Sequence, residues 1–158
     1  MNFEQYQNYL IDTATSLLSI DSTSGFTAKV TDYLIDTVKE LGYPVYKNNI
    51  GNVIVTVEGE DDSEPVALSA HVDTLGLMVR SITSDGMLMI TSIGSPLLPS
   101  LDGEYCNIHT RDGRVYTGTI LSLSPAVHVF PDASTRDRDE QNMAVRIDEI
   151  VHSKEDVE

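Results

Sequence analysis

The spacing of apolar residues changes near residue 45, and this change constrains the fold more than any other feature. Before it, apolar side chains recur every three or four positions and predict two helices, separated by turn-forming residues 21–25. The expected core positions are Phe3, Tyr6, Leu10, Ala14, Leu17 and Leu18, then Val30, Tyr33, Leu34, Val38 and Leu41. Gly42 suits a left-handed helix end, and Pro44 prevents continuation. From Val45 the period is two, so we expect an α/β arrangement with helices on at least one face of a sheet.

The second half of the chain is predicted to form strands with no helix between them. The expected strands are residues 77–83, 87–93, 105–110, 115–121 and 144–150. Asp85-Gly86 and Asp112-Gly113 mark tight hairpin turns. Short strands at this spacing are typical of a small barrel or sandwich. We therefore expect residues 1–74 to form an α/β segment and residues 75–158 an all-β segment.

Two segments near the C-terminal end lack this strand pattern. Residues 124–143 are polar and irregular, so we expect a loop that is mobile or shaped by a partner chain. Ser153 is positioned to cap the start of a helix, and the chain ends about one turn later. We therefore expect that the polypeptide stops inside an element and is a truncated piece.

Composition excludes several classes of function. The net charge is −15 and no basic patch is present, which argues against nucleic acid or anionic lipid as a partner. No apolar run approaches ~18 residues, so no membrane span is expected. The first five residues lack a basic region followed by an apolar one, so no signal peptide is expected, and the single cysteine, Cys106, is consistent with a reducing cytoplasm.

A histidine and an aspartate lie two residues apart at the end of an apolar run. Residues 65–70 predict a buried strand, and His71 and Asp73 follow it. An imidazole and a carboxylate at the mouth of a strand can serve a divalent metal, one as ligand and the other as its support. His109 and His152 favour structural or solvent roles, and His128 is ambiguous. The pattern therefore predicts one corner of a metal site.

The order of these features resembles a known family. Residues 70–79, Ala-His-Val-Asp-Thr-Leu-Gly-Leu-Met-Val, resemble the first metal-binding motif of the glutamyl and deblocking metallo-aminopeptidases, the tetrahedral aminopeptidases whose relatives were formerly labelled endoglucanases. Residues 18–25 resemble the loop between that family's first two helices, and residues 49–53 its Gly-Asn hairpin. Residues 84–86, 113–120 and 125–128 fit its inserted β-domain. The resemblance covers essentially the whole chain.

The resemblance implies a fold, an activity and cofactors. The fold would be the N-terminal part of a zinc-exopeptidase-like α/β domain, with two helices and a mixed sheet, followed by an inserted β-barrel. The activity would be removal of N-terminal residues from short peptides by water that two divalent ions, zinc or cobalt, activate. His71 would bind one ion, and Asp73 would orient its imidazole as part of the catalytic machinery.

Partners and completeness follow from the same resemblance. The β-domain would pair subunits into dimers that build a larger shell. The family's remaining ligands and general base lie beyond the inserted domain, so we expect this chain to be inactive alone. The alternative is a non-catalytic assembly or regulatory module acting through the β-domain. A carbohydrate hydrolase is disfavoured, because aromatic residues are only 6% and no tryptophan is present to stack on sugars.

Overall fold

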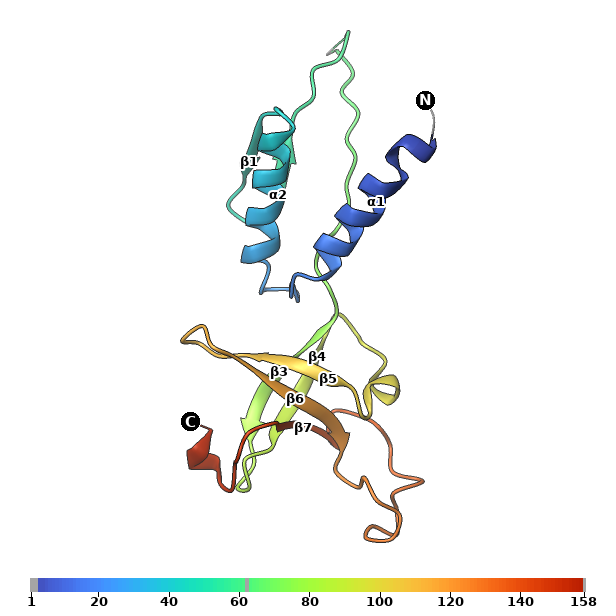
Figure 1. Ribbon diagram of the computed structural model, residues 1–158, viewed down its shortest axis with the longest axis vertical. Helices are drawn as coiled ribbons and strands as arrows, with labels where there is room; N and C mark the ends of the chain where they lie inside the picture. The colour runs from blue at the N-terminus through green and yellow to red at the C-terminus, as the bar shows by residue number, and fades with distance from the viewer. Residues whose placement is uncertain (1–2, 62, 158) are drawn as a thin grey trace. The chain divides into compact units, whose positions relative to one another are not determined.

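The computed structural model describes residues 3–61 and 63–157 (Figure 1). The chain divides into two compact units, Met1–Leu75 and Gly76–Glu158, which we call the N-terminal unit and the β unit. No helix in the described ranges is both long and apolar enough to cross a membrane.

Two helices and one pair of strands form the N-terminal unit (Figure 1). The helices are α1 (Phe3–Leu18) and α2 (Ala28–Glu40), and the strands are β1 (Val45–Lys47) and β2 (Val53–Val55). The strands pair antiparallel, and α2 packs against both of them. Gly42 has a φ of +83° and its N–H donates to the Lys39 carbonyl at 2.9 Å, as expected for a glycine that ends a helix. The prediction of two helices followed by strands is confirmed.

The apolar stripe of α1 is largely exposed, so the prediction that it lies in a core is wrong. Phe3 and Leu18 are 71% and 76% exposed, whereas Val30 of α2 is completely buried. Periodicity identifies the apolar face of a helix, but burial also needs a surface that packs against that face. β1 and β2 supply such a surface for α2, and no described helix or strand packs extensively against α1.

The predicted buried strand at residues 65–70 is also wrong. These residues form no strand, and Val66 and Leu68 are 89% and 98% exposed. A strand exists only through hydrogen bonds to a neighbour, and the described residues offer this segment no ladder. The one sheet-like contact nearby is an isolated parallel bridge between Thr23 and Thr74. The expected mixed sheet is therefore represented by the antiparallel β1–β2 pair and this bridge.

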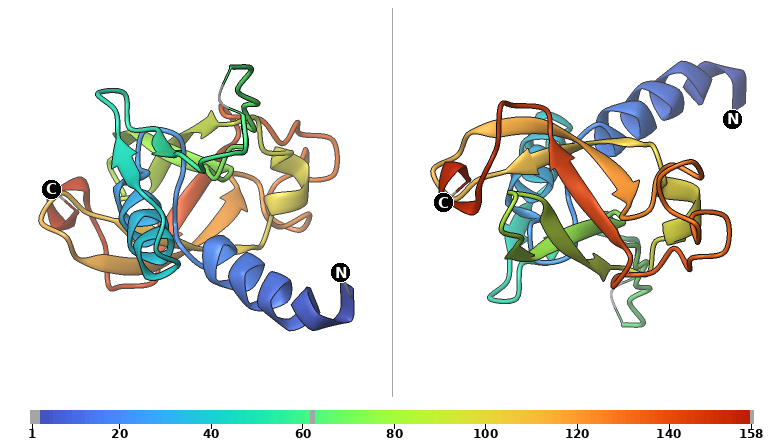
Figure 2. Two further views of the ribbon diagram at one scale, coloured as in Figure 1. Left: turned by 90° about the horizontal axis from the view of Figure 1, so that it is seen from above. Right: turned by 90° about the horizontal axis from the view of Figure 1, so that it is seen from below.

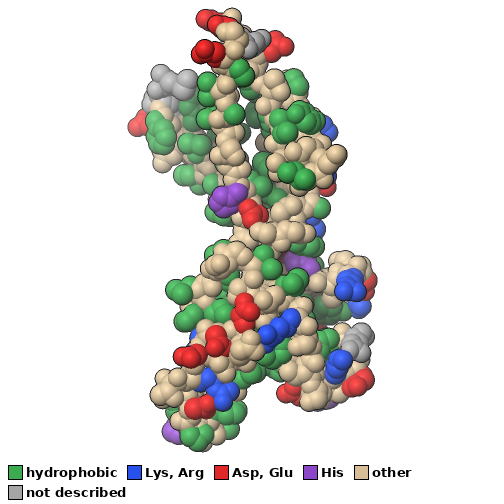
Figure 3. Space-filling view, turned by 180° about the vertical axis from the view of Figure 1, so that it is seen from behind, with side chains coloured by type: hydrophobic (Ala, Val, Ile, Leu, Met, Phe, Trp, Pro, Cys, Tyr) green, Lys and Arg blue, Asp and Glu red, His purple; other side chains and the backbone are tan. Residues whose placement is uncertain are grey.

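The loop that precedes residue 65 is acidic and exposed. Its described carboxylates include Glu58, Glu60, Asp61 and Glu64, and acidic side chains gather at its tip (Figure 3). Asp62 lies outside the described residues. A solvated, charged turn is the expected state of such a run.

Five antiparallel strands form the curled sheet of the β unit (Figure 2). In chain order they are β3 (Gly76–Ile82), β4 (Leu88–Ile93), β5 (Tyr105–His109), β6 (Val115–Ser122) and β7 (Met143–Ile147). Their spatial order is β3-β4-β7-β6-β5, so β3 and β5 are the edge strands. The predicted Asp-Gly hairpins join β3 to β4 and β5 to β6.

The core of the β unit lies against the inner strands of the sheet. It consists of Leu88, Ile90, Leu98, Ile120, Met143 and Val145. Leu98 comes from the 3-10 helix η1 (Leu98–Leu101), which follows β4. Gly118 lies opposite Cys106 on β5 and Ile147 on β7, and the absence of a side chain there lets the neighbouring side chains close in.

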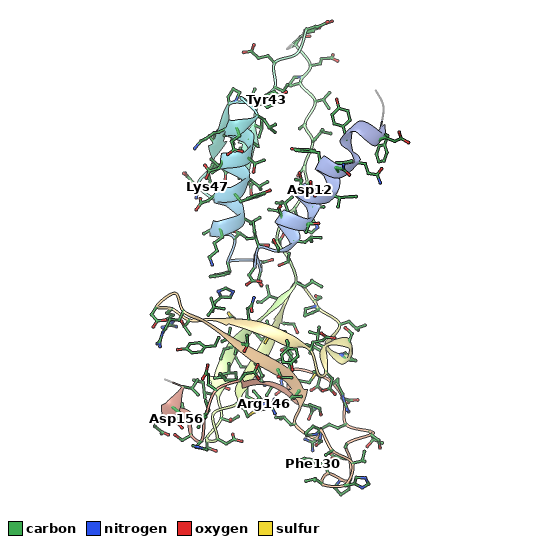
Figure 4. All side chains as sticks on the ribbon, viewed as in Figure 1. Asp12, Tyr43, Lys47, Phe130, Arg146 and Asp156 are labelled. Atoms are coloured by element: carbon green, nitrogen blue, oxygen red, sulfur yellow. The ribbon has the colours of Figure 1, made fainter. Side chains whose placement is uncertain are left out.

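The long connection between β6 and β7 is organised by its own hydrogen bonds. Arg138 donates to Asp102 Oδ2 at 3.1 Å and to the carbonyls of Ala133 and Arg136 at 2.9 and 2.7 Å. The Asp102 carboxylate also accepts from the Ser122 N–H at 3.0 Å. Figure 4 labels Phe130 within this connection. The Arg138 guanidinium therefore helps to order the β6–β7 connection, which the sequence predicted to be an irregular loop.

The C-terminal end of the described chain is a 3-10 helix, η2 (Lys154–Asp156). The predicted cap is present: Ser153 forms a capping box with Asp156. Asp156, which Figure 4 labels, accepts hydrogen bonds from the N–H groups of His152 and Ser153, both at 2.9 Å.

Candidate metal centre

The loop between α1 and α2 holds the segment that carries the His-x-Asp motif. Ser22 is completely buried; its hydroxyl donates to the Val72 carbonyl at 3.0 Å, and its own carbonyl accepts from the Thr74 N–H at 3.0 Å. Together with the Thr23–Thr74 bridge, these bonds fix the backbone on both sides of Asp73. Residues about 50 positions apart thus meet without a continuous strand.

His71 and Asp73 contact one another directly. Nδ1 of His71 lies 3.2 Å from Asp73 Oδ1 and 3.2 Å from the Asp73 carbonyl oxygen. Both of these oxygens accept, so in the neutral ring the contacts favour the proton on Nδ1 and the lone pair on Nε2. The His71 side chain is 86% exposed and that of Asp73 39%. The ring therefore presents an accessible nitrogen ligand, and the carboxylate fixes its tautomer.

The second oxygen of the Asp73 carboxylate has a partner of its own. The Ser24 hydroxyl donates to Oδ2, and this bond is the main reason that the pKa of Asp73 lies below its usual value. Gly25, with φ of +87°, and a 2.7 Å bond from the Phe26 N–H to the Thr23 carbonyl form the turn that presents Ser24. The sequence predicted only a turn here. The role of both serines was missed, because nothing local connects them to residue 73.

The two residues suit one corner of a metal site. A neutral imidazole oriented by a carboxylate is a common arrangement around divalent zinc. A catalytic zinc normally has about three protein ligands. Within residues 3–61 and 63–157, no group of three or more His, Cys, Asp or Glu side chains could hold an ion.

Other candidate groups have structural partners. Glu140 accepts from the Ser92 N–H at 2.6 Å, and Asp139 accepts from the Asn142 side chain at 2.7 Å. Cys106 is half-buried, and burial raises the pKa of its thiol. The two carboxylates thus have hydrogen-bond partners in the fold, and the thiol is shielded by burial.

Comparison with known proteins gives a consistent result. The model of the M42 glutamyl aminopeptidase family matches residues 51–158. The putative aminopeptidase YhfE of Bacillus subtilis (strain 168) is 44% identical over 142 residues, which cover 90% of this chain and 41% of that protein. The solved structure of an aminopeptidase from the archaeon Desulfurococcus kamchatkensis aligns with a TM-score of 0.82 at 26% identity, over 96% of this chain and 40% of its own.

A second structural relative is an assembling peptidase. The TET1 peptidase of Pyrococcus horikoshii, which can assemble into a tetrahedron or a large octahedral shell, aligns with a TM-score of 0.74 at 27% identity. The match covers 92% of this chain and 42% of that one. The chain thus spans 41% of the length of the curated relative described above. Because the family model covers more than half of the sequence, and because the fold agrees with that of solved aminopeptidases, this chain belongs to the M42 glutamyl aminopeptidase family.

Proposed function

We propose that these residues are the N-terminal portion of a metal-dependent aminopeptidase that removes N-terminal residues from short peptides. The observation that carries the proposal is the His71–Asp73 pair, in which Nδ1 is bonded and Nε2 is free on an exposed ring. Membership of the M42 family supports the aminopeptidase activity.

In this proposal each residue has a separate task. His71 binds a divalent ion through Nε2, and Asp73 keeps the proton on Nδ1 and sets the direction of the ring. When bound, the ions, two of zinc or cobalt, supply the Lewis acidity that activates water and polarises the scissile carbonyl. The Ser22 hydroxyl bonds to the Val72 carbonyl, and this bond holds the backbone next to His71 in place.

The remaining ligands and the general base are proposed to lie outside these 158 residues, and the chain alone is proposed to be inactive. A catalytic zinc normally has about three protein ligands. The His71–Asp73 pair offers one imidazole ligand and one carboxylate that supports it, so further ligands are needed for activity. To test both parts, the chain is titrated with Zn²⁺ while the ring signals of His71 are followed by NMR, and is assayed with Co²⁺ or Zn²⁺ on amino-acid p-nitroanilides. We expect Zn²⁺ to perturb the ring at Nε2 and no turnover to occur.

Two results would contradict the proposal. Turnover by the chain that disappears in His71→Ala would refute inactivity. No response of His71 to Zn²⁺, with a normal amide spectrum, would refute the ligand role.

We further propose that residues 1–74 belong to the catalytic α/β domain and that residues 75–158 form an inserted β-barrel that pairs subunits. The similarity to the shell-forming TET1 peptidase supports homo-oligomers built from dimers. Edge strands β3 and β5, which are not paired to each other in the described chain, could close the barrel or meet a second subunit. The half-buried, unpaired Cys106 fits a cytoplasmic location. Sedimentation of the chain should give concentration-dependent dimers, and a monomer at every concentration would contradict pairing through this chain.

A second candidate is a non-catalytic assembly or regulatory module, since among the described residues the His71–Asp73 pair offers an ion one imidazole and one supporting carboxylate. Such a module would form dimers while His71 remained insensitive to Zn²⁺. The titration and the sedimentation experiment together therefore distinguish the two functions.

A further inference from the structure

We propose that Ser24 is a positioning residue that acts on His71 through Asp73. This inference deepens the proposed function and rests on it for its significance, because a fixed imidazole matters most if the imidazole binds an ion. A continuous chain of contacts supports it: the Ser24 hydroxyl donates to Asp73 Oδ2, and Asp73 Oδ1 accepts from Nδ1 of His71 at 3.2 Å.

The carboxylate of Asp73 needs two fixed points to be held in one orientation. A bond at Oδ1 alone restrains rotation about the Cβ–Cγ bond less than bonds at both oxygens do. The Ser24 bond at Oδ2 supplies the second point, from a different part of the chain 49 residues away. With both oxygens occupied, Oδ1 faces Nδ1, and the tautomer with a free Nε2 is favoured.

Ser22 and Ser24 contact different parts of the segment around Asp73: Ser22 bonds to its backbone and Ser24 to the Asp73 side chain. Ser22 is completely buried, and its hydroxyl bonds to the segment around Asp73: to the Val72 carbonyl at 3.0 Å and, at 3.5 Å, to the Thr74 hydroxyl. Ser24 is exposed and bonds to the carboxylate itself. Removal of the Ser24 hydroxyl should therefore leave the loop and its backbone bonds intact while it frees the carboxylate.

The test reads the tautomer directly and requires no metal. The 158-residue chain, labelled with ¹⁵N in its histidine rings, is studied by long-range ¹H–¹⁵N spectroscopy at pH about 9, well above the usual pKa of imidazole. The His71 signals are identified by their loss in His71→Ala. In the unaltered chain, Nδ1 should be protonated and Nε2 unprotonated.

Three variants separate positioning from structure. In Ser24→Ala the Asp73 carbonyl, 3.2 Å from Nδ1, would be the remaining fixed acceptor for the ring proton, so both ring nitrogens should shift toward the averaged positions of a tautomer mixture. Ser24→Thr, which keeps a hydroxyl, should restore the original spectrum. Ser19→Ala is the matched control, since Ser19 is an exposed serine whose hydroxyl bonds to the Ser16 carbonyl at 2.8 Å, within its own helix end.

The outcomes are decisive in both directions. An unchanged ring spectrum in Ser24→Ala would overturn the proposal, and so would equal ring shifts in Ser19→Ala. If Ser24→Ala also displaced the amide signals of Ser22 and Thr74, the hydroxyl would only support the loop and the proposal would fail.

A separate titration with Zn²⁺ distinguishes a failure of this inference from a failure of the proposed function. Zn²⁺ should bind Ser24→Ala more weakly than the unaltered chain, by less than the roughly 10- to 100-fold loss typical when a direct partner of a ligand is removed. If Zn²⁺ leaves His71 of the unaltered chain unaffected, the metal function fails, whereas the metal-free tautomer result still decides the role of Ser24.

Discussion

Replacement of Gly118 by alanine should destabilise the β unit. A Cβ at this position would lie 2.7 Å from Ile108 Cδ1, 2.7 Å from Val145 Cγ1 and 3.0 Å from the Arg146 carbonyl oxygen. Two of these contacts are closer than real Cβ atoms allow, so the Ile108 and Val145 side chains or strand β6 itself would have to shift, while the Arg146 backbone limits movement toward β7. Arg146, labelled on β7 in Figure 4, marks one of these neighbours.

The size of the effect follows from two opposing contributions. Overpacking a filled core costs about 1–3 kcal/mol, and the reduced entropy of the unfolded chain returns about 0.4–1 kcal/mol, which leaves a net loss of about 1.3 kcal/mol at the middle of the two ranges. In a domain of this size each kcal/mol lowers the melting temperature by about 4–8 °C. Gly59→Ala is the control, because a Cβ there meets nothing closer than 3.8 Å.

Urea unfolding followed by circular dichroism, together with amide exchange of β6 and β7, measures this effect. The control should be neutral or slightly stabilising. Equal stability of Gly118→Ala and Gly59→Ala would refute the close packing of β5, β6 and β7 around this glycine.

Three further predictions concern the same unit. Met143→Ala, at a completely buried position, should cost about 2–5 kcal/mol in urea unfolding. Arg138→Ala removes bonds to a carboxylate and two carbonyls and should cost about 1.5 kcal/mol, with faster amide exchange in the β6–β7 connection, whereas the more exposed Arg114→Ala should change little. The bond from the Ser92 N–H holds the pKa of Glu140 below its usual value of 4.5, so this carboxylate stabilises the fold above that pH and loses its contribution as pH falls through the lower, folded pKa. In Glu140→Gln the fall in melting temperature below about pH 4.5 should be shallower; an unchanged slope would contradict that contribution.

The hairpins of the β unit could be predicted because their chemistry is local. Both contain Thr-x-Asp-Gly, at residues 83–86 and 110–113, and in both the threonine hydroxyl donates to the aspartate while the glycine N–H donates to the threonine carbonyl. Gly86 and Gly113 have φ of +85° and +86°, which glycine adopts without strain. Every contact lies within five residues, so the sequence contains all the information that these turns need.

The wrong predictions concern segments whose burial depends on residues far away in the sequence. Residues 65–70 have the composition of a buried strand, yet Leu68 is almost fully exposed because the described residues provide no adjacent strand. The stripe of α1 fails for the same reason, whereas α2, which packs against β1 and β2, has the completely buried Val30. An apolar pattern specifies what a segment would bury, and the tertiary structure decides whether it does.

The proposed metal-binding pair, His71 and Asp73, could be predicted in part: one of its contacts is local and another depends on a distant residue. Side chains two residues apart point to the same side of an extended chain, so an imidazole and a carboxylate spaced like His71 and Asp73 can meet through local geometry alone. That spacing explains why the Nδ1–Oδ1 contact was foreseeable and the Ser24 contact was not. The local contact, however, occupies only one oxygen of the carboxylate, and a group held at one point can turn away. In the proposed metal site a distant donor takes the second oxygen of the carboxylate, and in this fold the loop between α1 and α2 provides that donor.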